Sequence, residues 1–422
     1  MTQGAAAHAE RSGASERRIR TRGQAVALAA AEAMLASHVP HALLLVGPAG
    51  VGKTTLALDL AAALLCVDPI PARRPCRVCR ACRAVDHGNH PDLHRLGPTG
   101  AGAVIPIGGR EGRGVRDLIG ELALMPVEGG ARVAIVEAAH RMTDDAQTAL
   151  LKTLEEPPVG ATMILCADDE ERLLPTVRSR CVRLRLGPVP RRDIEVILVD
   201  RGLADPAAAA RLARVASGRP GVALAYAAAP DAAIARAEIA RTILDLASGS
   251  RAARLTGLRD LAGRAAELVK ALDAGAARVN TADGVAPVAS AAGKGRRGGR
   301  SMSAAAETAG DTTPGESADS PATELAEGRS AVRVPAAERR AAALALIGVW
   351  RDLLRDLATV AAGEPRLVRD VELIDDLERV AGATTTPDLG AALRRLDTAG
   401  ERLEGNVSPE LVLDVLALQH GA

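Results

Sequence analysis

A glycine-rich stretch that could hold phosphate lies between an apolar run and a helical pattern. The residues Gly47-Pro-Ala-Gly-Val-Gly52-Lys53-Thr54 fit the pattern G-x-x-x-x-G-K-[ST]. Backbone N–H groups freed by glycine, the Lys53 ammonium and a Thr54 hydroxyl on Mg²⁺ together suit a nucleoside triphosphate. A glycine-rich turn without a ligand is the alternative. The predicted nucleotide-binding residues of this loop are Gly47, Gly50, Gly52, Lys53, Thr54 and Thr55.

Nucleotide hydrolysis also needs acidic groups at the end of a second strand, and the sequence supplies them only in part. The apolar run 133–136 is followed by Glu137 and then by Ala138. Glu137 could reach a bound Mg²⁺ through a water, but the methyl group of Ala138 cannot accept a proton from an attacking water. Loss of a general base removes about 10²–10⁴ in rate, so we expect ATP or ADP binding with little turnover. A solvated strand end is the alternative interpretation of Glu137.

Four of the six cysteines are clustered with the spacing Cys66-x9-Cys76-x2-Cys79-x2-Cys82. Four thiolates fill the tetrahedral shell of a structural Zn²⁺, and the arginines around them would lower the thiol pKa values. We therefore predict a zinc site with no open coordination position. The alternatives are free thiols, an iron–sulfur cluster, or a thiolate replaced by one of three nearby histidines, His87, His90 and His94.

Composition limits the classes of function that these motifs can serve. The chain has 422 residues, enough for roughly three domains. Lys plus Arg total 53 against 52 Asp plus Glu, so no global field attracts polyanions. One Trp, one Tyr and no Phe argue against a base-stacking platform. No apolar run is long enough for a membrane span, no signal peptide is recognisable and cysteines are sparse, which predicts a cytoplasmic protein without membrane contact.

The pattern of apolar runs predicts an α/β sheet followed by helices. Short apolar runs at 41–46, 133–136, 162–167 and 182–186 alternate with helical stretches, as in a parallel sheet. One helix is sharply bounded, since Thr143 can cap its start and Pro157-Pro158 end it. From Pro190 onward only helical patterns remain. They are interrupted by a Gly-, Ser- and Ala-rich stretch that reads as a disordered insertion.

Several motifs follow one another along the chain: the phosphate loop, the cysteine module inserted after its helix, Leu150-Leu-Lys-Thr-Leu-Glu-Glu-Pro-Pro158, Ser179-Arg180-Cys181, Trp350-Arg-Asp-Leu-Leu354 and Asn406-Val-Ser-Pro-Glu-Leu-Val-Leu413. Taken in this order, they resemble those of bacterial clamp-loader subunits of the DNA polymerase III holoenzyme, the delta-prime and gamma/tau subunits of the AAA+ superfamily. The resemblance spans about residues 20–419 without the insertion.

The resemblance implies both an architecture and a division into domains. An AAA+ P-loop domain with a parallel sheet and an inserted zinc module would be followed by a helical lid and an all-α collar. The predicted boundaries are a flexible tail at 1–19, the AAA+ domain at 20–188 with its zinc module at 66–82, the lid at 189–230, the collar at 231–275 and 330–422, and a disordered insertion at 276–329.

The resemblance also implies a pentameric loader in which Arg180 is an arginine finger offered in trans to nucleotide on the neighbouring subunit. A guanidinium suits the charge that develops on a transferring phosphate. A local ion pair of Arg180 with Asp168 or Glu170 is the alternative. The implied partners are gamma/tau and delta subunits, with the sliding clamp and primer-template DNA reached through the complex. The complex would work within a DNA polymerase holoenzyme, a nucleotidyltransferase.

Departures from the motor pattern favour a delta-prime-like role. Glu137-Ala138 replaces an Asp-Glu pair, and Ala167 stands where a phosphate-sensing Thr or Asn usually follows the strand. The segment 217–224 resembles the version without the second sensor arginine, although Arg219 is close by. The intact phosphate loop favours an ATP-hydrolysing gamma/tau-type motor instead. A zinc-containing P-loop protein of another DNA-processing pathway is the third alternative, and a basic cluster at 294–300 could contact DNA phosphates if it is more than linker.

Overall fold

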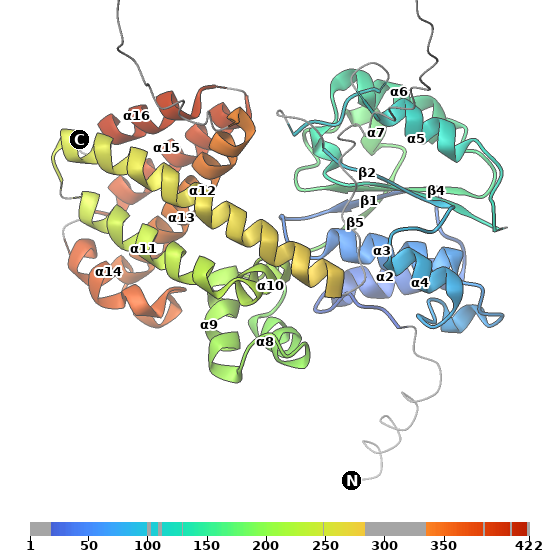
Figure 1. The fold of residues 1–422 in the computed structure, drawn as a ribbon, viewed down its shortest axis with the longest axis horizontal. Coiled ribbons are helices and arrows are strands. Elements are labelled where there is room, and N and C mark those ends of the chain that lie inside the picture. Colours follow the sequence, from blue (N-terminus) through green and yellow to red (C-terminus); the bar gives the residue numbers. More distant parts are fainter. Residues whose placement is uncertain are drawn as a thin grey trace, which may run out of the picture.

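The computed structural model describes residues 18–98, 103–108, 112–128, 130–247, 249–282, 335–382, 385–405 and 407–419. Two parts are visible, an α/β part and an entirely helical part (Figure 1). Most of the predicted N-terminal tail and all but the first residues of the predicted insertion, including the basic cluster at 294–300, lie outside the described residues.

A parallel five-stranded sheet forms the centre of the α/β part, in the order β2-β3-β4-β1-β5. The strands are β1 Ala42–Val46, β2 Leu93–Leu96, β3 Arg132–Val136, β4 Ala161–Ala167 and β5 Val182–Arg185. Every residue of β1, β3 and β4 is buried, which explains their continuous apolar runs. The predicted α/β fold with a phosphate loop after its first strand is confirmed. The edge strand β2 is missing from the sequence prediction, because two polar residues occupy its middle.

Helices cover both faces of the sheet (Figure 1). One face carries α2 Ala25–Ala36, α3 Lys53–Leu65 and α4 Arg80–Asp86, and the other carries α5 Val115–Leu122, α6 Asp144–Glu155 and α7 Pro175–Arg178. The helix α3 is the helical pattern predicted after the phosphate loop, and it begins at Lys53 within the motif. The predicted cap of α6 is also present, since Oγ1 of Thr143 accepts a hydrogen bond from the N–H of Ala146. Both faces are therefore closed by apolar packing, which leaves the ends of the strands as the accessible edge.

The remaining helices share one apolar core that includes Trp350. They are α8 Arg191–Asp200, α9 Pro206–Ala216, α10 Pro220–Ala228, α11 Pro230–Ala247, α12 Arg251–Ala282, α13 Ala336–Ala361, α14 Ile374–Ala381, α15 Thr386–Glu404 and α16 Pro409–Gln419. Short 3-10 turns lie at 71–73, 139–141, 365–367 and 371–373. The division of these helices into lid and collar stays a prediction, since a single core crosses the predicted boundary.

The long helix α12 corrects the predicted start of the insertion, because residues 276–282 are helical rather than linker. A Cβ on Gly275 would stand 2.7 Å from the carbonyl oxygen of Ala225 in α10, so the glycine lets the two helices approach closely. Val279 is buried one turn further on. The carboxyl-terminal end of α12 therefore reaches the α/β part (Figure 1). Within the described parts of the chain, every helix is too short or too polar to span a bilayer.

Candidate nucleotide and metal sites

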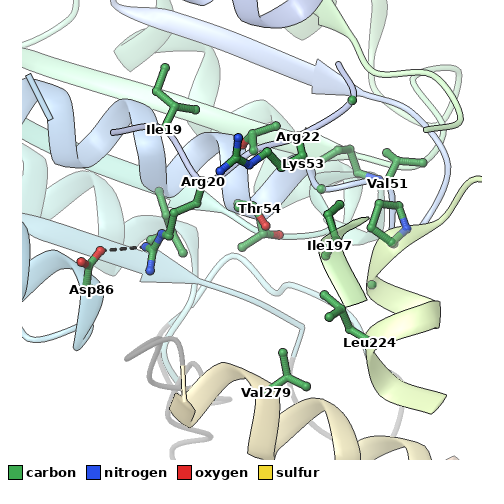
Figure 2. Close-up of a pocket in the computed structure, with 18 of the residues that line it drawn as sticks. Ile19, Arg20, Arg22, Val51, Lys53, Thr54, Asp86, Ile197, Leu224 and Val279 are labelled. Carbon is green, nitrogen blue, oxygen red and sulfur yellow. Dashed lines mark hydrogen bonds and ion pairs between the residues drawn. The ribbon is translucent and has the colours of Figure 1, made fainter. Parts of the chain in front are cut away.

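A cleft of about 1800 Å³ lies at the carboxyl ends of the central strands and contains the phosphate loop. Figure 2 shows Lys53 and Thr54 at its centre, with Arg20 from the N-terminal segment on one side. Ile197 of α8, Leu224 of α10 and Val279 of α12 line other parts of its wall. The two parts of the chain therefore enclose the cleft together, and the predicted glycine-lysine loop is brought to a site large enough for a nucleotide.

Two glycines of the loop are required, Gly47 by a close contact with another backbone segment and Gly50 by its backbone conformation. A Cβ on Gly47 would stand 2.1 Å from the carbonyl oxygen of Leu186, just beyond β5. Gly50 has a left-handed backbone, with φ +80°, and its carbonyl oxygen accepts a hydrogen bond of 2.9 Å from the N–H of Gly221 in α10. The loop is thus held by the sheet on one side and by α10 on the other, without any ligand.

The ammonium of Lys53 is bonded within the chain itself. Nζ lies 2.7 Å from Oδ1 of Asp168 and donates to the carbonyl oxygens of Gly47 and Pro48 at 2.6 and 2.8 Å. The side chain of Lys53 is 7% exposed, whereas that of Asp168 is 40% exposed. Lys53 must therefore leave Asp168 before it can bind a phosphate. Asp168 directly follows β4, and sequence reasoning considered it only as a partner for Arg180.

Glu137 is paired with an arginine that the sequence analysis did not identify as a site residue. Nε and Nη2 of Arg95 donate to Oε1 of Glu137 at 2.9 and 2.6 Å, and the two side chains are 10% and 23% exposed. Arg95 lies in β2, beside β3, so recognising it requires the strand order. The carboxylates after β3 and β4 are thus each paired with a cation, and Thr54, the predicted Mg²⁺ ligand, lines the same cleft.

A histidine supports the loop that carries Asp168. The N–H of Asp168 donates to Nδ1 of His140 at 3.1 Å. Burial lowers the pKa of His140, although the nearby carboxylate of Asp168 opposes this effect. A neutral imidazole can accept this hydrogen bond at Nδ1, whereas imidazolium cannot. His140 thus holds Asp168 in place as an acceptor.

The sulfur atoms of Cys66, Cys76, Cys79 and Cys82 all lie within 4.8 Å of one another. Sulfurs about 2.3 Å from a tetrahedral Zn²⁺ would be about 3.8 Å apart, and Sγ of Cys66 and Sγ of Cys79 are 3.9 Å apart. Backbone N–H groups of Cys79 and Cys82 also approach the sulfurs of Cys76 and Cys79 at 3.4 Å. The four cysteines therefore fit a metal ion with the predicted ligand set.

The thiols of this cluster differ in their surroundings. Burial raises the pKa of Cys66 and of Cys82. For Cys76, hydrogen bonds from the backbone of Val78 and Cys79 outweigh desolvation and lower the pKa to about 7. His87, His90 and His94 are not part of the cluster of close ligand atoms, and His90 and His94 each lie near a glutamate, Glu128 and Glu121 respectively. The histidine alternative therefore has no geometric support.

The cysteine module is joined to the helix of the phosphate loop through Arg77. Its guanidinium pairs with Asp59 of α3, which is 1% exposed, and with Asp86 at 2.6 Å. Asp59 also accepts hydrogen bonds from the backbone N–H and hydroxyl of Thr21 at 2.9 and 2.7 Å. The ion pair between Arg20 and Asp86, seen in Figure 2, completes the network. The module thus fixes both α3 and the N-terminal segment at the edge of the cleft.

Arg180 does not lie among the described residues that line the cleft. It follows α7, where Nη1 donates to the carbonyl oxygen of Thr176 at 2.9 Å and Nη2 lies 2.5 Å from Oε1 of Glu155. Neither sequence-based alternative partner is used, since Asp168 pairs with Lys53 and Glu170 lies near Arg183 and Arg185. The side chain is 34% exposed at the carboxyl end of α6, so it remains accessible to a neighbouring molecule.

Comparisons with known proteins find relatives of the α/β part. Residues 24–190 match the family model described as DNA polymerase III, delta subunit. The chain is 39% identical over 170 residues to the delta' subunit of DNA polymerase III from Pseudomonas aeruginosa, which covers 40% of this chain and 50% of that relative. It is 36% identical over 185 residues to the delta' subunit from Escherichia coli, which covers 44% of this chain and 54% of that relative. It is 32% identical over 198 residues to the tau subunit from Escherichia coli, which covers 46% of this chain and 29% of that relative. The chain thus spans about half the length of the delta' relatives.

Solved structures also resemble the chain. A DNA polymerase III gamma subunit-related protein from Thermotoga maritima aligns with a TM-score of 0.38 and 16% identity, covering 93% of this chain and 98% of that one. The RuvB Holliday junction branch migration motor of the same organism aligns with a TM-score of 0.32 and 19% identity, covering 48% and 58%.

Proposed function

We propose that this chain, whose residues 24–190 match the family model described as DNA polymerase III, delta subunit, is a delta-prime-like subunit of a bacterial clamp loader. It would bind a nucleotide without hydrolysing it efficiently and act as a stator. Its partners would be gamma/tau and delta subunits, with the sliding clamp and primer-template DNA reached through the complex. In this proposal the protein is located in the cytoplasm.

One observation carries the stator role. The end of β3 offers Glu137, which is paired with Arg95, and then Ala138, whose methyl group cannot act as a base. The expected loss of general-base catalysis is about 10²–10⁴ in rate. Lys53 is also held by Asp168 and by the loop's own carbonyl oxygens. Both features support binding with weak or absent turnover, rather than an independent motor.

In this proposal Arg180 contributes to ATP hydrolysis in trans, on the neighbouring subunit. Its exposure and its location outside the chain's own cleft support a role toward a neighbouring subunit. In a loader reconstituted with wild-type partners, Arg180→Ala should lower the DNA-stimulated ATPase rate by about 10³ or more at the site it serves. Arg178→Ala is a matched control two residues earlier, at the end of α7, since Arg178 pairs with Glu171 instead. An unchanged ATPase rate with Arg180→Ala would refute the assignment.

A structural Zn²⁺ on the four cysteines completes the proposal. Metal analysis of the purified chain should find about one zinc per chain, because four thiolates fill a tetrahedral shell. Cys79→Ser should remove it, whereas Cys181→Ser should not, since Cys181 lies outside the cluster. Iron in place of zinc would support the iron–sulfur alternative.

A gamma/tau-type motor is the second candidate, and the complete phosphate loop favours it. Steady-state ATP hydrolysis by the purified chain distinguishes the two. Robust turnover that Lys53→Ala abolishes would support the motor and contradict the stator. Failure to recover sliding clamp or loader subunits in a pull-down would instead favour a protein of another DNA-processing pathway.

A further inference from the structure

We propose that Arg77 is a positioning residue that couples two binding sites, so that a metal ion on the four cysteines and a nucleotide in the cleft strengthen each other's binding. This coupling rests on the nucleotide and metal binding proposed above. It makes the affinity of each site depend on the occupancy of the other, and it assigns that dependence to one guanidinium.

Arg77 lies inside the cysteine module, in a backbone conformation that an arginine rarely adopts. Its φ is +60°, in the left-handed region. Because a Cβ makes this region unfavourable, the surroundings of Arg77 must hold it there. Part of the constraint is the turn between two of the cysteines, in which the N–H of Cys79 approaches Sγ of Cys76 at 3.4 Å. A metal ion on these sulfurs would fix both ends of the turn.

The side chain of Arg77 leaves the module and is only 9% exposed. Its guanidinium pairs with Asp59 of α3, which is 1% exposed, and Nη1 lies 2.6 Å from Oδ1 of Asp86. Nε donates to the carbonyl oxygen of Arg18 at 3.0 Å, and the N–H of Arg18 donates to the carbonyl oxygen of Pro75 at 3.2 Å. Arg77 therefore joins the cysteine module both to the helix of the phosphate loop and to the N-terminal segment.

The N-terminal segment 18–23 lines one side of the nucleotide cleft (Figure 2). It is held by the same carboxylate that Arg77 contacts, since the N–H and the hydroxyl of Thr21 donate to Asp59 at 2.9 and 2.7 Å. The module lines the cleft as well, through Cys76 and Arg77. The metal cluster and the nucleotide would thus share a wall of the cleft.

Loss of the metal would release the turn that contains Arg77. With the four sulfurs no longer held together, the backbone of Arg77 could leave the left-handed region, and its guanidinium would move away from Asp59. A nucleotide would then have to order segment 18–23 as it binds, at a cost in affinity, whereas the metal-loaded chain presents this wall already in place. The coupling is reciprocal, so a bound nucleotide must tighten the metal site by the same factor.

The test measures two equilibrium constants on the full chain. Calorimetry gives the dissociation constant of ADP for the zinc-loaded and the metal-free chain, and titration with a chelating dye gives that of Zn²⁺ with and without ADP. Both constants should change by the same factor, about tenfold. Lys53→Ala controls for Zn²⁺ that ADP holds in solution, because this variant should lose ADP binding and with it the effect of ADP on the zinc constant.

Two variants test whether the coupling passes through Arg77. Arg77→Lys keeps a positive charge but lacks the fork that bonds two carboxylates and a backbone oxygen together, so the factor should fall below about twofold. Arg83→Lys is the matched control and should keep the tenfold factor. Arg83 belongs to the same module, but its guanidinium donates to the carbonyl oxygen of Val78 at 3.0 and 2.7 Å, and it is not among the described residues that line the cleft.

The possible results separate the coupling from the binding on which it rests. A factor that persists in Arg77→Lys would overturn the role of Arg77, and coupling that arises only because the metal-free chain unfolds would give this result. If the wild type binds ADP and Zn²⁺ independently, the coupling is overturned and the proposed nucleotide and metal binding are left intact. If the wild type binds no ADP or no Zn²⁺, the proposed binding is overturned together with the coupling.

Discussion

Removing the carboxylate of Asp168 should strengthen nucleotide binding, although Asp168 lies at the phosphate site. In the structure, Nζ of Lys53 lies 2.7 Å from Oδ1 of Asp168, and this ion pair must break before Lys53 can bind a phosphate. Asp168→Asn removes the competing charge. It keeps the backbone N–H that donates to His140.

The size of the effect follows from the exposure of the pair. Because the side chain of Asp168 is 40% exposed, solvent screens the attraction, and we assign it the upper value for surface ion pairs, about 1 kcal/mol. This free energy corresponds to about a fivefold lower dissociation constant for ADP. Loss of a negative charge beside the phosphates acts in the same direction.

Calorimetry on the full chain with ADP measures this change. Asp169→Asn is the matched control, because Asp169 is the next residue, is 50% exposed and lies near Arg172 instead of Lys53. Equal tightening in both variants would indicate a general effect of surface charge. An unchanged or weaker affinity for Asp168→Asn alone would refute the competition between Asp168 and phosphate.

Three further predictions concern stability, each measured as thermal unfolding by circular dichroism. Gly47→Ala should lower the free energy of unfolding by about 3 kcal/mol even without nucleotide, because the new Cβ would stand 2.1 Å from the carbonyl oxygen of Leu186. An unchanged Tm would contradict this. Arg77→Met should lower the free energy of unfolding by about 3 kcal/mol, because the buried carboxylate of Asp59 loses its closest cation. Arg80→Met, at a position 84% exposed, should lower it little, and equal effects would argue against the buried network. Burial lowers the pKa of His140 below its ordinary value of 6.5. The neutral imidazole therefore stabilises the fold fully above about pH 6.5, and this contribution is lost as pH falls through the lowered pKa. The fall in Tm between about pH 7 and about pH 5 should thus be smaller in His140→Gln than in the wild type, and an identical fall would exclude this role.

The phosphate loop and the cysteine module could be predicted from the sequence because their chemistry depends on residues close together in the chain. The loop from Gly47 to Thr54 and the helix that begins at Lys53 follow from glycine conformations and a local apolar pattern. The cysteines need only the loop that joins them to bring four sulfurs within 4.8 Å. The buried strands β1, β3 and β4 were likewise recognisable from continuous apolar runs.

Short or polar elements escaped prediction because burial, not composition, defines them. The strand β2 has only four residues, and its two central residues are polar. The end of α12 lay in a stretch that reads as linker, yet it is helical because Gly275 packs against α10. Helix propensity alone could not reveal that contact.

What the sequence by itself determined is therefore the inventory of chemistry: a phosphate loop, four thiols, and an acidic strand end without a base. The tertiary structure decided which charges meet. Arg95 and Glu137 are 42 residues apart and pair because β2 lies beside β3, while Lys53 reaches Asp168 because β1 lies beside β4. Ion pairs of this kind depend on strand order, which no local pattern encodes, and they set the charge balance of the cleft.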